Sequence, residues 1–91
     1  MAKIDLRQIN RILKALANER RLKILDYLSR VKSASVGDIS NYLNLSFKST
    51  SGHLTILERA GLLERKQKGL YVFYSIDQDR TNLVKSTLKI I

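Results

Sequence analysis

The sequence predicts a mainly α domain with one β-hairpin in its second half, and three observations lead to this class. Up to residue 60, apolar residues recur at intervals of three and four, the period of amphipathic helices. After Gly61 the pattern changes to two short extended runs around Gly69. With 91 residues and no linker, repeat or low-complexity tract, the chain is expected to form a single domain over residues 1–91.

Two amphipathic helices are expected first. The first helix should end near Ala17, and its apolar residues at helical spacing are Leu6, Ile9, Leu13 and Leu16. Asn18 can cap the second helix, because its side-chain oxygen can accept from the free N–H groups of the first turn. The second helix should end around Ser29 or Arg30, and its buried stripe consists of Leu22, Leu25 and Leu28.

A connector at residues 31–34 has room for a short strand and leads to a third helix. Ser35 can cap this helix, and Asp38, three residues later, can reach back as in a capping box. The third helix is expected to run to about Leu43.

A tight turn separates the third helix from the fourth. Only Asn44–Ser46 lies between them; Ser46 is a suitable N-cap, and Gly61 ends the fourth helix. Two helices joined by three or four residues form a helix-turn-helix, whose second helix can enter the major groove of DNA.

A β-hairpin and a closing helix complete the predicted fold. The strands are expected at Leu62–Lys66 and Leu70–Ile76, separated by Gln67–Gly69, and the last helix should run from Asp77 or Asp79 to Ile91. The resulting order, α-α-α-α-β-β-α with the hairpin as a wing, is a winged helix-turn-helix.

The charge of the chain favours a polyanionic partner. Seventeen Lys and Arg against eight Asp and Glu leave a formal net charge of +9, and the pI is about 10.2. Double-stranded DNA is the first expectation and an anionic membrane surface the second. No apolar run is long enough for a signal peptide or a membrane span, so we expect a cytoplasmic protein and no membrane partner.

The fourth helix carries the candidate DNA-reading residues. Its first half contains hydroxyls, a lysine and the only histidine of the chain, and its first acid is Glu58. Lys48 can reach a guanine edge or a phosphate, and the hydroxyls can donate to phosphates or bases. The candidates for this recognition helix are Phe47, Lys48, Ser49, Ser51, Gly52, His53 and Thr55.

Three of these candidates have two interpretations. Phe47 either packs under the turn or touches a thymine methyl group. His53 either contacts a phosphate or is a half-buried ring that holds the helix to its neighbours. Gly52 costs helix stability, about 1 kcal/mol relative to Ala, and allows a close approach of the backbone either to DNA or to another helix.

The hairpin adds a compact group of cations. Arg65, Lys66 and Lys68 surround its turn together with the uncharged Gln67. There they can follow a phosphate backbone or place an arginine in the minor groove. A solvated charged loop is the alternative, but the neighbouring recognition helix favours DNA.

Several segments together resemble the ArsR/SmtB family of bacterial and archaeal transcriptional repressors, over about Leu13 to Ile76. The order and spacing of the segments make the resemblance specific. The matching segments are Leu16-Ala17-Asn18 with Arg21 and Ile24-Leu25, then Ser51-x-His53-Leu54-x-x-Leu57, and then Ala60-Gly61-Leu62-Leu63 with Gly69 and Tyr74. The resemblance implies a homodimer, joined through its first and last helices, that binds an operator with two recognition helices and is released by a signal. It also favours a structural role for Arg21.

The chain departs from this family at its metal sites. Metal-sensing members have a Cys-x-Cys pair where this chain has Ser35-Val36-Gly37-Asp38, and others have histidine ligands on the last helix, where this chain has none. The chain contains no cysteine, which excludes disulfides and thiolate sites. Asp38, Asp77 and Asp79 are interpreted as caps and surface groups rather than magnesium ligands. We therefore expect no metal and no cofactor, and the effector is not predicted.

The first and last helices carry more apolar residues than one buried side requires, which indicates a dimer interface. The candidate interface residues are Leu6, Ile9, Ile12, Leu13, Leu83, Leu88 and Ile91.

The function expected from the sequence is that of a homodimeric, sequence-specific repressor at a palindromic operator. The alternative is a winged-helix protein-interaction module with only nonspecific affinity for nucleic acid. An enzyme is not expected, because the chain has no phosphate-binding glycine loop, no paired carboxylates at a cleft and no set of metal ligands.

Overall fold

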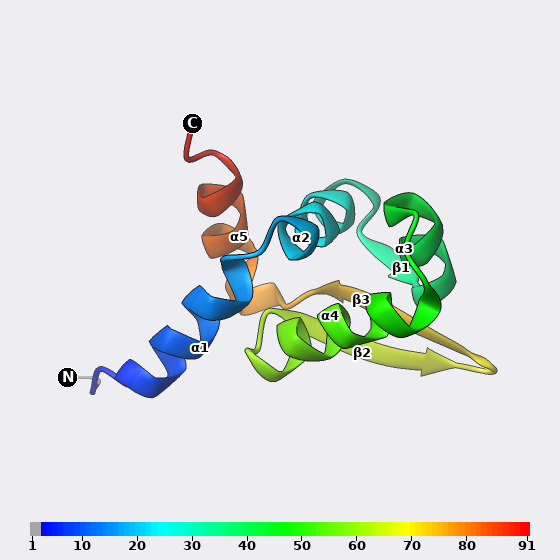
Figure 1. The fold of residues 1–91 in the computed structure, drawn as a ribbon. Coiled ribbons are helices and arrows are strands. Elements are labelled where there is room, and N and C mark those ends of the chain that lie inside the picture. Colours follow the sequence, from blue (N-terminus) through cyan, green and yellow to red (C-terminus); the bar gives the residue numbers. More distant parts are fainter. Residues whose placement is uncertain (1–2) are drawn as a thin grey trace.

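The computed structural model describes residues 3–91 and has the predicted winged helix-turn-helix architecture (Figure 1). The helices are α1 (Leu6–Leu16), α2 (Glu19–Val31), α3 (Val36–Leu43), α4 (Phe47–Arg59) and α5 (Thr81–Leu88). The strands are β1 (Ser33–Ser35), β2 (Leu63–Lys68) and β3 (Tyr71–Ile76), and the short 3₁₀ helix η1 (Gln78–Arg80) precedes α5. In Figure 1, α1 and α5 lie at one side of the molecule and the hairpin tip points to the other.

One hydrophobic core joins all five helices to the sheet. The fully buried side chains come mainly from α2, α3 and α4, so these three helices contribute most of the centre of the core. The core consists of Ile12, Ala15, Leu16, Ile24, Leu25, Leu28, Ala34, Val36, Ile39, Leu54, Leu57, Ala60, Leu62, Leu63, Tyr74 and Val84.

The sheet has three antiparallel strands in the order β1-β3-β2, so the short connector after α2 forms a true strand. Ala34 of β1 pairs with Tyr74 of β3, and Arg65 of β2 pairs with the same tyrosine from the other side. Because Ala34 and Tyr74 are both buried, this pairing anchors the hairpin to the core.

Caps at Asn44 and at the predicted Ser46 form the turn of the helix-turn-helix. The Ser46 hydroxyl accepts from the backbone N–H of Ser49 at 3.0 Å, which starts α4. Asn44 ends α3 in a left-handed conformation with φ of 54°. The backbone N–H of Leu45 then donates to Ser40 at 3.1 Å, the bond of a Schellman ending. The same geometry ends α4 at Gly61, whose φ is 77°.

The first strand of the hairpin ends later, and the loop between the strands is shorter, than the sequence predicts. Lys68 pairs with Tyr71, which leaves a two-residue loop of Gly69 and Leu70 instead of three residues between the strands. Gly69 has a φ of 61°, as a two-residue hairpin loop requires at its first position. The expected strand ends were wrong because Gln67 and Lys68 were counted as turn residues from their polarity, although backbone pairing continues through both.

The last helix is shorter than predicted. It ends at Leu88, so Ile90 and Ile91 lie beyond it, and a 3₁₀ turn precedes it. The Asp77 carboxylate caps this turn by accepting from the N–H of Asp79 at 2.9 Å. Within residues 3–91, none of the helices has both the length and the apolar character needed to cross a membrane.

Candidate nucleic-acid interface

Helix α4 turns one face to the core and another to solvent. Thr50, Leu54 and Leu57 have no exposed surface, whereas Lys48 and Gly52 are exposed. Thr50 is tolerated in the core because its hydroxyl donates to the carbonyl of Ser46 at 2.9 Å. The buried side chains fix the rotation of α4, and the rotation presents Lys48 to solvent.

A hollow of about 490 Å³ is lined by α4, the hairpin and the start of α3. Ser51 and Thr55 line it from α4, where both are half-buried, while Ser49 is half-buried at another part of the helix. Phe47 also faces this hollow and is 63% exposed, so it does not pack under the turn. The position is compatible with a contact to DNA.

Gly52 lies on the exposed face of α4 with open space around it. A Cβ atom built there would meet nothing within 4 Å. Another helix of the same chain therefore does not explain this glycine, and the approach of an external partner is the remaining interpretation.

His53 joins the recognition helix to the junction of α1 and α2. Its Nδ1 lies 3.4 Å from a guanidinium nitrogen of Arg21. Because a guanidinium can only donate, Nδ1 must be unprotonated to accept this bond. Burial lowers the pKa of His53, and the positive charges of Arg21 and Arg20 lower it further.

Arg21 itself holds the end of α1. Its Nε donates to the carbonyl of Ala15 at 2.7 Å, and its Nη2 donates to the carbonyl of Lys14 at 3.0 Å. These carbonyls belong to the last turn of α1, where no helical N–H reaches them. The structural role expected for Arg21 is thus visible in its contacts.

The hairpin places its cations on two faces. Strand alternation puts Lys66 and Lys68 on the outer face with Phe73, and the Lys68 ammonium lies 5.8 Å from the Phe73 ring centre. Arg65 is on the inner face, where its Nε lies 3.9 Å from the carboxylate of Glu58 in α4. All three cations are exposed, but only Arg65 of the three has a carboxylate neighbour in the part of the chain that the structure describes.

Tyr74 lies next to Arg65 in the sheet and is buried. Burial raises the pKa of its hydroxyl and Glu58 raises it further, while Arg65 acts in the opposite direction. Tyr74 therefore stays neutral and serves the packing of the hairpin against α4.

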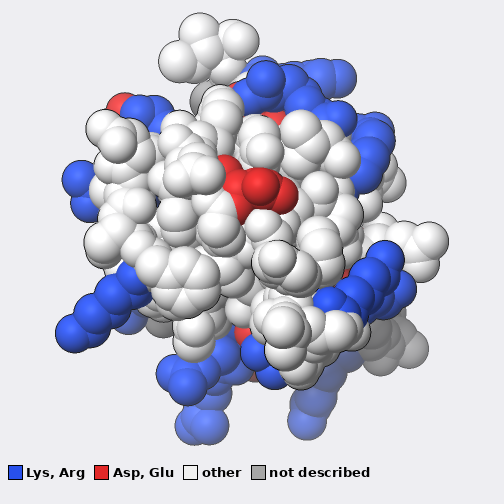
Figure 2. Space-filling view, turned by 90° about the vertical axis from the view of Figure 1, so that its right-hand side faces the viewer, with Lys and Arg blue, Asp and Glu red and all other residues white. Residues whose placement is uncertain are grey.

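Figure 2 shows the side of the molecule toward which the hairpin tip points. Lys and Arg side chains project around the margin of this face, uncharged side chains fill most of its centre, and the largest acidic patch lies near the centre. A polyanion that approaches this face is attracted at its edges, where the cations lie, and not at the acidic patch near its centre.

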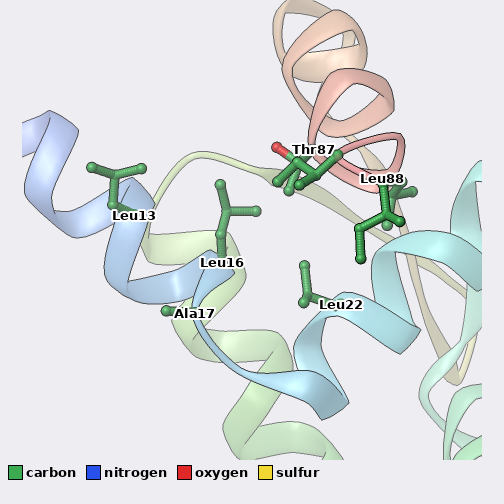
Figure 3. A pocket seen from close by; sticks show the side chains of 8 residues that line it. Leu13, Leu16, Ala17, Leu22, Thr87 and Leu88 are labelled. Atoms are coloured by element: carbon green, nitrogen blue, oxygen red, sulfur yellow. The ribbon is translucent and has the colours of Figure 1, made fainter.

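An apolar groove of about 540 Å³ lies away from the hairpin (Figure 3). Leu13 and Leu16 line it from α1, Leu22 from α2, and Leu88 from α5. Ile90 and Ile91, beyond α5, complete the groove, and Ile91 is fully exposed.

The candidate interface residues differ in how much of their side chain is exposed to a partner. Leu6 is 73% exposed and Leu13 is 58% exposed, and Ile9 is also exposed. Leu83 and Leu88 are half-buried and pack against the core. Ile12 is only 8% exposed and belongs to the core, so it has almost no surface for an interface. The helical period alone does not show which of the apolar residues on this helix points into the core.

Two exposed apolar residues, one on α4 and one in the hairpin loop, are not among the candidate site residues. Ile56 lies on α4 between the buried Leu54 and Leu57, and it is 45% exposed. Leu70 was counted as a strand residue, but it occupies the hairpin loop and is 96% exposed. Only the pairing of Lys68 with Tyr71 shows that Leu70 lies in the turn.

The side chains of this protein that can bind a metal ion are those of His, Asp and Glu. Among residues 3–91, no three of these side chains come together in a way that could hold an ion. Asp38 lies in the first turn of α3, and its backbone N–H donates to the Ser35 hydroxyl at 3.1 Å, so Ser35 is the residue that caps this helix.

Comparison with known proteins decides the family. Residues 18–65, from the start of α2 into β2, match the family model described as bacterial regulatory protein, arsR family. This chain belongs to the ArsR family. The transcriptional repressor SdpR of Bacillus subtilis is 36% identical over 69 residues, which are 76% of each chain. The regulator YgaV of Escherichia coli is 33% identical over 86% of this chain and 79% of its own length.

Solved structures of related regulators share the fold. HlyU from Vibrio cholerae is 32% identical and superimposes with a TM-score of 0.84 over 98% of this chain and 97% of its own. Mb0332 of Mycobacterium bovis, described as a homodimeric winged helix-turn-helix DNA-binding domain, is 31% identical with a TM-score of 0.87, over 99% of this chain and 89% of its own. The ArsR-family chain is thus a DNA-binding transcriptional regulator with a winged helix-turn-helix fold.

Proposed function

We propose that this ArsR-family regulator is a homodimeric repressor that occupies a palindromic operator. The observation that carries the proposal is the position of α4, whose acid-free first half faces solvent beside a cationic hairpin. The apolar groove and the exposed residues of α1 lie at the other side of the molecule, where a second subunit would not cover α4.

The dimer is inferred from apolar surface that one subunit leaves uncovered. Leu6, Leu13 and Ile91 are all more than half exposed, and they lie on α1 and directly after α5. Leu13 and Ile91 line the same groove, and exposed apolar surface of this kind marks an interface. The homodimeric state of Mb0332 supports the same arrangement in this chain.

DNA recognition is assigned to two elements. α4 enters the major groove, where Lys48 reaches a base edge or phosphate and the hydroxyls of Ser49, Ser51 and Thr55 donate to the backbone or to bases. The hairpin follows the phosphates with Lys66 and Lys68. Two such units related by a twofold axis read half-sites about 34 Å apart.

Repression follows from occupation of promoter DNA, without chemistry on a substrate. The charge of +9 supports nucleic acid over a membrane as the partner. We infer that the protein is not an enzyme and acts in the cytoplasm, where its DNA is found.

Selection of bound duplexes from a random DNA pool tests the proposal. A palindromic winner should bind about 10³-fold or more tightly than a scrambled copy of the same length. Lys48→Ala should weaken binding, whereas Lys85→Ala, which removes the same charge from an exposed position on α5, should leave the preference for the winner unchanged. Equal, steeply salt-dependent binding to both duplexes would show that only charge is read.

Sedimentation tests the dimer separately. The wild-type chain should sediment as a dimer at micromolar concentration. Leu13→Asp should sediment as a folded monomer, because Leu13 is mostly exposed in the subunit and its replacement leaves the core intact. A wild-type monomer at these concentrations would contradict the proposal.

A further inference from the structure

The tip of the hairpin is apolar although its stem is cationic. Leu70 is 96% exposed and the adjacent Tyr71 is 66% exposed. Polar residues and glycine usually occupy such loops, so a leucine there has no role in forming the turn. An isolated exposed leucine is ordinary, but one at the projecting tip of a binding element is placed to contact a partner.

The surroundings of Leu70 identify the kind of partner. Lys66 and Lys68 lie on the same hairpin, and Leu70 lines the same hollow as Phe47 of α4. A partner that enters this hollow beside Leu70 also meets Arg65 and the start of the recognition helix, while Lys66 and Lys68 project from the outer face of the same hairpin. DNA has the required negative charge and extends continuously between these elements.

The tip has the shape for a narrow groove. Its loop contains only Gly69 and Leu70, and neighbouring strands lie about 4.8 Å apart. The Gln67 side chain donates to the carbonyl of Gly69 at 3.3 Å, which supports the loop from within. The minor groove of B-DNA is about 6 Å wide, so it admits a side chain at the tip but not the whole stem.

We propose that Leu70 enters the minor groove of the operator and acts as an apolar wedge that partly opens a base step. This inference rests on the proposed DNA-binding function and adds a specificity determinant to it. Apolar side chains inserted between base pairs unstack them and bend the duplex. Because pyrimidine–purine steps such as TA deform most easily, Leu70 selects for such a step under the hairpin without any hydrogen bond to a base.

Fluorescence of 2-aminopurine tests the wedge directly. The probe replaces adenine at the step under the hairpin in the selected operator, and its emission should rise on binding of the wild-type protein because the base loses its stacking. Leu70→Ala should abolish this rise and weaken operator binding about tenfold, the scale of one lost base-pair contact. Leu70→Met, which keeps a long apolar side chain, should retain both.

A change in the DNA provides the matching control. Replacing the flexible step with a stiff A-tract should weaken binding of the wild-type protein and have little effect on Leu70→Ala. Equal affinity and equal fluorescence for wild type and Leu70→Ala would overturn the wedge while leaving operator binding intact. Loss of self-association in Leu70→Ala, measured by sedimentation, would also overturn it by assigning the tip to a protein contact. Failure of the wild type to prefer any operator would instead refute the proposed function.

Discussion

The recognition helix and the hairpin tip contribute to the same surface, but different forces hold them. α4 sends Thr50, Leu54 and Leu57 completely into the core. The tip, from Lys68 to Tyr71, is exposed throughout and is held by backbone pairing between β2 and β3. The orientation of α4 therefore depends on the stability of the whole domain, whereas the tip can change its side chains without affecting the core. Four experiments test this difference.

The largest effect is expected for the buried face of α4. Leu57→Ala should lower the free energy of unfolding by about 2–5 kcal/mol, because it removes a fully buried side chain and leaves a cavity. Leu70→Ala should change it by less than about 0.5 kcal/mol. Urea denaturation of both variants measures the difference, and a similar loss in the two would contradict the distinction between the helix and the tip.

The exposed lysines should separate reading of sequence from attraction to phosphate. Lys48→Ala should reduce discrimination between the operator and single-base variants by about 1–3 kcal/mol if its ammonium reaches a base. Lys66→Ala and Lys68→Ala should weaken binding to all sequences evenly, and each should reduce the salt slope by about one. Titrations at several salt concentrations distinguish the two patterns, and a uniform loss with Lys48→Ala would assign that residue to phosphate.

Gly52→Ala should change stability and DNA binding in opposite directions. The new Cβ meets nothing within 4 Å, so the substitution should raise the free energy of unfolding by about 1 kcal/mol through higher helix propensity. Operator affinity should fall, because the methyl group separates the backbone from the DNA. Unchanged affinity would show that the open space at Gly52 is not used by DNA.

The smallest effect is expected from the titration of His53. Its pKa is lowered in the folded protein, so the unfolded chain binds the proton more readily and stability rises with pH. This contribution is complete above the ordinary histidine pKa of about 6.5 and decreases as the pH falls through that value. His53→Asn can still accept from Arg21 but cannot titrate.

Denaturation of the wild type and His53→Asn across about pH 5.5–7.5 measures this contribution. The wild type should lose more stability on acidification than the variant, in which the remaining pH dependence comes from other groups. Parallel curves would show that the contact between His53 and Arg21 does not depend on protonation.

The local signals in the sequence predicted most of the fold. Ser46, Asn18 and Gly61 mark helix ends through backbone groups of their own or of nearby residues, so their effects can be derived without knowing the tertiary fold. Leu54 and Leu57 are three residues apart, the spacing that places both on one face of a helix, and both are buried. The cationic character of Lys66 and Lys68 follows directly from their chemistry.

Other features depend on which residues come together in space. The sequence alone predicted the order of elements, the helix-turn-helix and the basic surface, because these arise from periodicity, capping and charge. The tertiary structure decided that Ile12 is buried, that Arg21 joins α1 to His53, and that Leu70 lies at an exposed tip. These features come from packing between distant segments and from strand register, and neither is contained in the period of a single helix or strand.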